Sequence, residues 1–493
     1  MYIRMLFLIV ITFFTSRLLL ATLGIEDFGI NSVVGSIATT FVSLKALFSE
    51  SVQRFLNYEK GRNSLDGQRS VFSLGIIIHI ILAIVFVLIV EAIGTWLIYN
   101  KLEIPLEKIG TAYFVFQMTI IAVFISIFSI PFDAVIIANE KMGVYAFVTI
   151  VDALLKLGAV LVISWIGYNK LRIYSALLIL VPVFTLSYQL IYCRRFPECR
   201  LTRHYDKSLF RSLLSLSGWN FLGNITFSLV HEGVNMLLNM FGGLVYNAAR
   251  TVSYQVKSVA SQISSNTIIS ARPKIMQRAA VDDKNVVFNN INAISRVSFI
   301  TILLPVCVLL TYTGQLLDIW LVDVPDSAVD FTRLLLLGIA VRSLHDPLNV
   351  MYMAYAKIKR MMIIEAVVMI SFLLIIYFSL KLGAAIWIPF AEMVLMESVI
   401  IAGLLINANN ELGFNIANYI RKVVAPFIIL SAVTIAICYL FNRYVPATGT
   451  VDTLIKSCIV AIVYMGVAVL MLNQQEKGLL KNLFLKIIRK KTN

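Results

Sequence analysis

The chain has 493 residues, of which 59% are hydrophobic and only 14% are charged, and its formal net charge is +15. Soluble proteins carry about 25% charged residues, so this composition excludes an ordinary soluble domain and indicates a protein embedded in a lipid bilayer. Membrane topology and attraction to anionic lipid headgroups account for the excess of lysine and arginine, so we expect no nucleic-acid partner.

The predicted elements are helices that cross the membrane, each of which needs about 20 mainly apolar residues. Such stretches predict fourteen spans, at residues 5–24, 29–54, 71–98, 111–138, 143–167, 172–193, 212–241, 244–271, 291–314, 331–355, 361–382, 384–406, 421–442 and 452–472. The connections between them are short. The sequence therefore predicts an all-α integral membrane protein without a large soluble domain.

Lysine and arginine are distributed unevenly among the connections. They are concentrated in alternate ones, such as 194–211 and the segment after residue 472, whereas the connections between these hold few. Basic residues are retained on the cytoplasmic side of a membrane. The asymmetry therefore predicts that both termini are cytoplasmic.

A polar helical face occurs twice, in the second and in the eighth predicted spans. The two copies, which are offset by 218 residues (32 to 250), are Ser32, Ser36, Thr39, Ser43, Glu50 and Arg54, and Arg250, Tyr254, Lys257, Ser261, Ile268 and Arg272. Each set falls on one side of a 3.6-residue helix. Paired polar faces in a repeat indicate a shared water-filled pathway, although a hydrogen-bonded seam between packed helices would give the same pattern.

The repeat predicts two lobes. Six spans separate the copies, and an even number makes the corresponding helices run in the same direction. We therefore predict an N-terminal lobe over 1–193, a cytoplasmic linker over 194–211, a C-terminal lobe over 212–410, and two further spans with a basic tail over 411–493.

Several titratable residues lie within the predicted spans. His231, Glu232 and Asn235 share a polar region of the seventh span, and Asp133 follows Pro131 in the fourth. Ionisable residues at membrane depth are candidates for ion coupling. The candidate carriers are His231, Glu232 and Asp133, and the isolated acids Glu365, Glu392 and Glu397 are further possibilities.

Two other sets of residues favour structural roles. Asp152 and Lys156 are spaced i, i+4 and are expected to pair with each other. The five cysteines show no disulfide pattern and no metal-ligand spacing. We therefore expect no metal site and no cofactor.

The N-terminal segment carries a recognisable pattern. It consists of Thr15-Ser16-Arg17, Leu23-Gly24-Ile25-Glu26-Asp27-Phe28-Gly29-Ile30, Val34-Gly35, and Ser51-Val52-Gln53-Arg54-Phe55-Leu56-Asn57-Tyr58-Glu59. The pattern resembles the bacterial polysaccharide transporters, the Wzx-like O-antigen flippases of the multidrug/oligosaccharidyl-lipid/polysaccharide (MOP) exporter superfamily. This resemblance implies a two-lobed MOP/MATE-like helical bundle that works by alternating access.

The resemblance also implies a function. Such proteins move an undecaprenyl-diphosphate-linked oligosaccharide, an O-antigen or capsule repeat unit, from the inner to the outer leaflet of the bacterial cytoplasmic membrane, alongside other glycan-assembly proteins. They are transporters rather than enzymes. Relatives that flip the peptidoglycan precursor use membrane arginines in the first, second and eighth spans, and Arg17, Arg54, Arg250 and Arg272 stand in comparable places.

The residue chemistry favours the same interpretation. A diphosphate left bare in hydrocarbon costs many kcal/mol, so its route needs arginine or lysine. Asparagine and tyrosine can exchange hydrogen bonds with sugar hydroxyls. The candidate substrate-binding residues are Arg17, Arg54, Arg250, Tyr254, Lys257, Arg272 and Asn235. No nucleotide-binding G-x-x-x-x-G-K-[ST] motif occurs, so H⁺ or Na⁺ coupling is the expected source of energy.

Two other functions compete with this interpretation. A cation-coupled multidrug exporter of the same superfamily would have the same fold, but it would present acidic residues to its substrates, and the repeated polar faces carry more base than acid. A membrane O-antigen polymerase or ligase would use a large outer loop for catalysis. The predicted outer connections are short.

Overall fold

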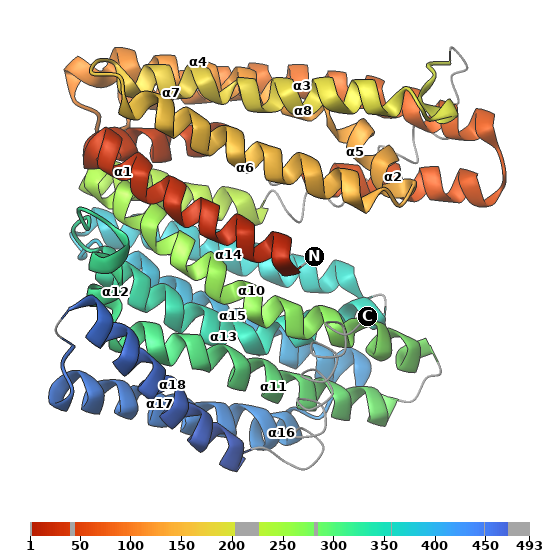
Figure 1. Ribbon diagram of the computed structural model, residues 1–493. Coiled ribbons are helices and arrows are strands. Elements are labelled where there is room, and N and C mark those ends of the chain that lie inside the picture. Colours follow the sequence, from red (N-terminus) through yellow and green to blue (C-terminus); the bar gives the residue numbers. More distant parts are fainter. Residues whose placement is uncertain are drawn as a thin grey trace. The chain divides into compact units, whose positions relative to one another are not determined.

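The structure is a computed structural model that describes residues 2–39, 45–202, 226–280, 284–355, 357–447 and 449–471 (Figure 1). Every regular element among these residues is a helix, and none is a strand. A helix suits a bilayer because it satisfies its backbone hydrogen bonds internally. The predicted all-α class is confirmed.

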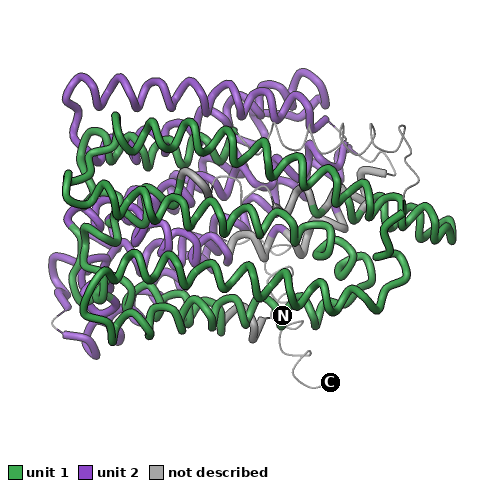
Figure 2. The backbone as a smooth tube through the Cα atoms, turned by 90° about the horizontal axis from the view of Figure 1, so that it is seen from above, with its two compact units in different colours: residues 1–248, 321–325 green, residues 249–320, 326–493 purple. Residues whose placement is uncertain are grey.

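The chain divides into two compact units (Figure 2). Unit 1 consists of residues 1–248 and 321–325, and unit 2 consists of residues 249–320 and 326–493. The lobe and linker boundaries that the sequence suggested at residues 193, 211 and 410 stay a prediction.

The elements of unit 1 follow the hydropathy pattern closely. They are α1 (Tyr2–Thr39), α2 (Lys45–Gly61), α3 (Leu65–Asn100), the 3₁₀ turn η2 (Leu106–Lys108), α4 (Ile109–Phe128), α5 (Ile130–Ala138), α6 (Met142–Ser164), α7 (Lys170–Leu178), α8 (Leu180–Cys193), the 3₁₀ turn η3 (Pro197–Cys199) and a helix over residues 226–242. The predicted pair of Asp152 and Lys156 on α6 is confirmed, with 2.8 Å between Oδ2 and Nζ.

Unit 2 begins within a long polar helix. The elements are α10 (Leu244–Ala280), whose first residues belong to unit 1, α11 (Lys284–Thr311), α12 (Thr313–Trp320), α13 (Ala328–Ala354), α14 (Ile358–Lys381), α15 (Ile388–Leu412), α16 (Ile416–Tyr419), the π-helical turn η4 (Ile420–Val424), α17 (Ala425–Tyr444) and α18 (Thr450–Met471). Helix α11 packs against α13, α17 and α18. Buried tyrosines join these helices, as when the Tyr464 hydroxyl donates to the Ile300 carbonyl at 2.8 Å.

Eleven helical stretches of the described residues are long and apolar enough to cross a membrane. The difference from fourteen has three sources. Helix α1 runs through the predicted first connection, span 212–241 is described only from residue 226, and α10 is long enough but too polar to be counted. The number fourteen therefore stays a prediction.

Helix α1 bends at Gly24, whose φ of 77° lies in a region that residues with a Cβ rarely adopt. A break within a membrane helix is tolerated when side chains satisfy the backbone nearby. The Lys170 ammonium donates to the carbonyl of Thr22 at 3.3 Å, and Lys108 pairs with Glu26 and Asp27 on the other side of the bend at 2.9 and 2.8 Å. Gly24 therefore permits the bend, and contacts from Lys108 and Lys170 stabilise the helix on both sides of it.

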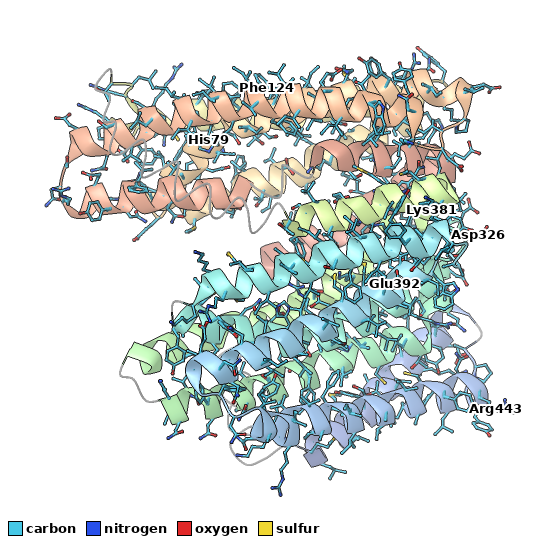
Figure 3. The ribbon with its side chains drawn as sticks, turned by 180° about the vertical axis from the view of Figure 1, so that it is seen from behind. His79, Phe124, Asp326, Lys381, Glu392 and Arg443 are labelled. Carbon is cyan, nitrogen blue, oxygen red and sulfur yellow. The ribbon has the colours of Figure 1, made fainter. Side chains whose placement is uncertain are left out.

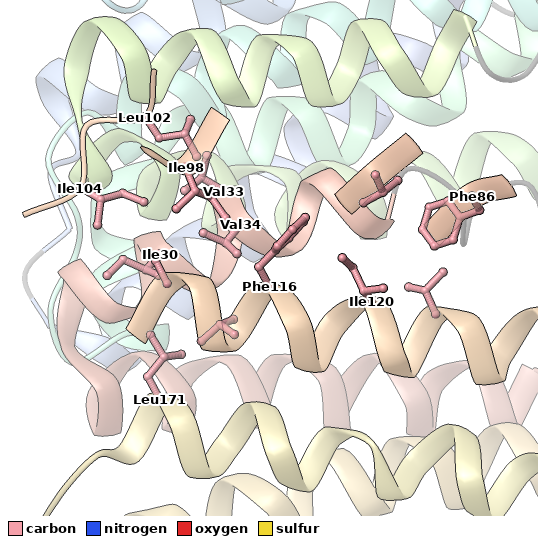
Figure 4. Close-up of a cluster of buried hydrophobic side chains, with 14 of the residues drawn as sticks. Ile30, Val33, Val34, Phe86, Ile98, Leu102, Ile104, Phe116, Ile120 and Leu171 are labelled. Carbon is pink, nitrogen blue, oxygen red and sulfur yellow. The ribbon is translucent and has the colours of Figure 1, made fainter. Parts of the chain in front are cut away.

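The apolar core of unit 1 lies among α1, α3 and α4 (Figure 4). Ile30 and Val34 of α1 are fully buried and so is Phe116 of α4. A Cβ added to Gly94 of α3 would clash with the Phe116 ring, so this glycine leaves the space that the ring fills. Close packing of this kind makes the core sensitive to small changes in volume.

Replacing Gly29 of α1 with alanine is expected to destabilise unit 1. The added Cβ would collide with the backbone carbonyl group of Leu244, lying 2.9 Å from its carbon, and backbone cannot rotate away as a side chain can. Such overpacking costs about 1–3 kcal/mol. Thermal unfolding of the detergent-solubilised protein should show a lower midpoint.

Gly35 of the same helix provides the matched control. A Cβ at Gly35 meets nothing within 4 Å, and alanine favours a helix over glycine by about 1 kcal/mol. Gly35→Ala should keep or raise the midpoint. Equal midpoints for the two variants would mean that α1 and Leu244 do not lie in this close contact.

Candidate functional site

Three side chains of the predicted polar face lie together on α10. The Arg250 guanidinium carbon lies 4.2 Å from the centroid of the Tyr254 ring, and the Lys257 ammonium nitrogen lies 4.8 Å from it. Both positive charges interact with the electron-rich ring, which offsets part of their mutual repulsion. Arg250 is only 6% exposed. We call Arg250, Tyr254 and Lys257 the α10 cation cluster.

Neighbouring helices fix this part of α10. The Ser253 hydroxyl lies 2.8 Å from the carbonyl oxygen of Ala249 and 3.1 Å from that of Ala328, and it accepts a hydrogen bond from Thr332 at 3.0 Å. The Tyr254 hydroxyl contacts the sulfur of Met393 on α15 at 3.9 Å. The cation cluster is therefore held in place by α13 and α15.

A second group of charged side chains lies among α13, α14 and α15. Arg342 Nη1 lies 2.7 Å from Glu397 Oε1, and Arg342 Nε lies 3.6 Å from Asp346 Oδ1. His345 lies between two carboxylates, with Nε2 3.0 Å from Glu365 and Nδ1 3.1 Å from Glu397, and it is 0% exposed. We call these five residues the buried charge network after its buried members His345 and Glu397, whereas the other three are half-buried.

The geometry around His345 requires an additional proton. A neutral imidazole has one donor and one acceptor nitrogen, whereas an ionised carboxylate can only accept. Both ring nitrogens face carboxylate oxygens, so both contacts are hydrogen bonds only if the ring is doubly protonated or if one carboxylic acid holds the proton. His345, Glu365 and Glu397 can therefore pass one proton among themselves without a change of backbone.

The cation cluster and the network interact electrostatically, because Lys257 lies within Coulombic range of Glu397, Arg342 and Arg250. Together they contain three cations and three acids. These are Arg250, Lys257 and Arg342, and Asp346, Glu365 and Glu397. Adding a proton at His345 changes this balance by one charge, which acts strongly over short distances in a medium of low dielectric constant.

Asn235, a predicted substrate-binding residue, lies in a buried polar seam of unit 1 and is 1% exposed. Its side-chain amide donates to the carbonyl of Ser32 at 3.3 Å, and Asn247 donates to Asn235 Oδ1 at 2.9 Å. Asn239 donates to Asn247 at 3.0 Å and accepts from the Glu103 backbone at 2.8 Å. These bonds tie the helix over 226–242 to α10 and to the connection after α3.

The other residues of unit 1 that the sequence singled out lie on several different helices. Arg17 is exposed on α1, and Ser36 is buried with its hydroxyl donating to Val33 at 2.7 Å. Asp133 on α5 is buried and accepts from Gln189 of α8 at 2.5 Å. His231 lies 4.2 Å from the ring of Phe227, and Glu232 is half-buried.

Two predicted arginines have side chains outside the described part of the structure. Arg54 belongs to α2 and Arg272 to α10, but only their place in the helix is described. The side chain of Thr39 lies outside it as well. The proposal that these residues and the cation cluster share one cavity stays a prediction.

His345 and Asp346, at the centre of the network, were not among the predicted candidates, whereas Glu365 and Glu397 were predicted as isolated acids. The available signal was the spacing Arg342, His345 and Asp346 in one predicted span, because residues at i, i+3 and i+4 share a helical face. Charges within a span demand partners, and the next two spans hold the acids that supply them.

The fold is similar to that of known transporters. The chain is similar to a solved structure described as the lipid II flippase MurJ, inward closed conformation, with a TM-score of 0.70 and 12% identity over 94% of this chain and 98% of that chain. It is also similar to an inward-facing multidrug resistance MATE family transporter of the MOP superfamily, with a TM-score of 0.66 and 12% identity over 81% of this chain and 92% of that chain. No protein-family model matches the sequence, and no curated protein matches it significantly. The fold is the MOP/MATE-like helical bundle.

Among the described residues, no group of three or more histidine, cysteine, aspartate or glutamate side chains is placed to hold a metal ion. Within the buried charge network, guanidinium and imidazole nitrogens occupy positions beside the carboxylates. The described groups therefore provide two cations beside a tyrosine ring on α10 and a histidine between two carboxylates.

Proposed function

We propose that the chain is a flippase that moves an undecaprenyl-diphosphate-linked oligosaccharide, an O-antigen or capsule repeat unit, from the inner to the outer leaflet of the bacterial cytoplasmic membrane by alternating access. The observation that carries this proposal is the α10 cation cluster, in which Arg250 and Lys257 both lie close to the centroid of the Tyr254 ring, at 4.2 and 4.8 Å. The similarity in fold to a lipid II flippase supports a lipid-linked substrate.

The chemistry of the cluster suits a diphosphate that must bind and leave again. Arginine can donate two parallel hydrogen bonds to phosphate, and lysine supplies a mobile point charge. Tyrosine offers a flat apolar face to a sugar ring and a hydroxyl at its edge. The charges reach the substrate from one helix, so a rotation of that helix would present them to either side.

We propose in addition that the transport cycle is coupled to protons through the buried charge network. His345, Glu365 and Glu397 share an exchangeable proton, and Glu397 interacts with Lys257 of the cation cluster. A proton gained by the network raises the positive charge beside the cluster and strengthens its hold on an anion. Na⁺ coupling is the competing proposal, with a metal ion among the carboxylates in place of the proton.

The second candidate function is export of organic cations. The similarity to a multidrug resistance MATE transporter favours it, and so do the three carboxylates of the network, of which Glu397 lies within Coulombic range of Lys257. Those carboxylates are engaged by Arg342 and His345, however, and the side chains that project from α10 are cationic. We therefore favour an anionic substrate, and glycosyltransferase genes beside this gene would favour a glycan.

Purified protein in proteoliposomes can test both functions side by side. One set of vesicles contains a fluorescent undecaprenyl-diphosphate oligosaccharide, and flipping is followed by the fraction that an impermeant quencher reaches. A second set measures uptake of a fluorescent organic cation. We expect flipping well above that of protein-free vesicles and no cation uptake. Cation uptake without flipping would replace the flippase by the exporter.

A further inference from the structure

A groove opens on unit 2, and none of its lining residues belongs to the cation cluster or to the network. It has a volume of about 650 Å³ and lies among the ends of α11, α13 and α17. Its lining residues are Leu310, Arg333, Leu337, Ile435, Cys438, Tyr439, Asn442 and Arg443. The lining therefore combines two arginines and an asparagine with an apolar remainder.

The groove is nearly as long as one leaflet of a bilayer is thick. On α17 its lining residues run from Ile435 to Arg443, and on α13 from Arg333 to Leu337. Eight residue steps of helix rise by about 12 Å, whereas one half of the hydrocarbon core is about 15 Å thick. Figure 3 shows Arg443 at the same end of unit 2 as Asp326, which precedes α13.

Polar and apolar parts of the groove are separated along its length. Asn442 and Arg443 lie in the last turn of α17, and Arg333 lies in the second turn of α13, within reach of the interface through its long side chain. Leu337 and Ile435 lie deepest, and Ile435 and Tyr439 are more than half exposed. This order matches a lipid, with its headgroup at the interface and its chain below.

The two arginines give the groove a positive charge. No lining residue is acidic, and in the described part of the chain no carboxylate forms an ion pair with Arg333 or Arg443. Asp452, in the following helix, pairs with Lys456 at 2.6 Å. Two guanidinium groups at the depth of lipid headgroups favour a phosphate.

We propose that this groove binds one anionic phospholipid from the leaflet at this end of unit 2, with its phosphate on Arg333 and Arg443 and an acyl chain against Leu337 and Ile435. The distribution of basic residues predicts this leaflet to be the outer one. An undecaprenyl chain is much longer than one leaflet is thick, whereas an acyl chain fits the depth of the groove. The proposal does not depend on what the protein transports.

Photocrosslinking from inside the groove tests this proposal. The full-length protein carries p-benzoyl-phenylalanine in place of Tyr439 and is placed in phosphatidylcholine nanodiscs with a small fraction of either radiolabelled phosphatidylglycerol or radiolabelled phosphatidylcholine. We expect phosphatidylglycerol to crosslink about tenfold more, because phosphatidylcholine offers the same phosphate but adds a choline cation that the two guanidinium groups repel, and about 1.4 kcal/mol is a factor of ten. The preference should fall several-fold in Arg333→Gln/Arg443→Gln.

The control removes two positive charges from the other end of the same run of helix. Arg421→Gln/Lys422→Gln, in the exposed η4 turn, should keep the full preference. Arg443→Gln alone changes only an exposed side chain at a helix end, so it tests the proposal even if the double variant fails to fold. It should lower the preference by itself.

Three results would overturn the proposal. The first is equal crosslinking of the two phospholipids. The second is a preference that survives both Arg443→Gln and the double substitution. The third is displacement of phosphatidylglycerol by an equal fraction of undecaprenyl phosphate, which would assign the groove to the carrier lipid rather than to a phospholipid.

Discussion

Arg250→Gln and Lys257→Gln are each expected to abolish flipping of the lipid-linked glycan while the protein stays at normal abundance in the membrane. A neutral amide is similar in size but does not offset the desolvation of a phosphate. Losing one charge-assisted hydrogen bond removes about 2–3 kcal/mol of binding, a factor of roughly 30 to 140. The proteoliposome assay measures the rate, and surface glycan reports it in cells.

Two further variants test whether the geometry of the charged group and its position in the protein matter for flipping. Arg250→Lys keeps the charge but loses the two-pronged geometry, so it should retain part of the activity. Lys156→Gln removes a lysine that pairs with Asp152 on a half-exposed face of α6, and it should leave flipping unchanged. Wild-type rates in both Arg250→Gln and Lys257→Gln would show that the anion travels elsewhere, and Arg17 would be the next residue to test.

The sequence predicted the helices well because hydropathy is a local property. The predicted spans 143–167 and 331–355 agree with α6 and α13 within a few residues. The predicted first span ends at residue 24, where α1 bends, but the structure has one helix that continues beyond the bend, because a glycine with positive φ lets a helix resume after a break. Helix α10 was predicted as the span 244–271, and its polar face repeats an earlier one.

The candidate site was predicted in part. The spacing of Arg250, Tyr254 and Lys257 placed them on one face, and the structure brings their side chains into contact. The partners of His345 were beyond sequence reasoning, because Glu365 and Glu397 lie 20 and 52 residues away and meet it only through the packing of α14 and α15. Local periodicity predicts faces of helices, but it does not predict which faces meet.

Glu365→Gln is expected to uncouple flipping from the pH gradient. Wild-type flipping in proteoliposomes is expected to speed up under an imposed pH gradient and to ignore a Na⁺ gradient. The ion pair that Glu365 forms in the network is with His345, so its replacement removes one of the groups that share the proton while Arg342 keeps Glu397 as its partner. The flipping rates with and without the pH gradient should therefore become equal in this variant.

Replacing two other glutamates shows whether the loss of the pH response is specific to Glu365. Glu392→Gln is the matched control, because Glu392 lies on α15 outside the network and accepts from Ser379 at 2.5 Å, so the response to pH should persist. Glu397→Gln leaves the half-buried Arg342 without its closest partner and removes one of the two carboxylates that contact His345, so it should lower abundance. A normal response to pH in Glu365→Gln, or a wild-type response to Na⁺ alone, would remove the network from the coupling mechanism, and His231, Glu232 and Asp133 would again be the residues to test.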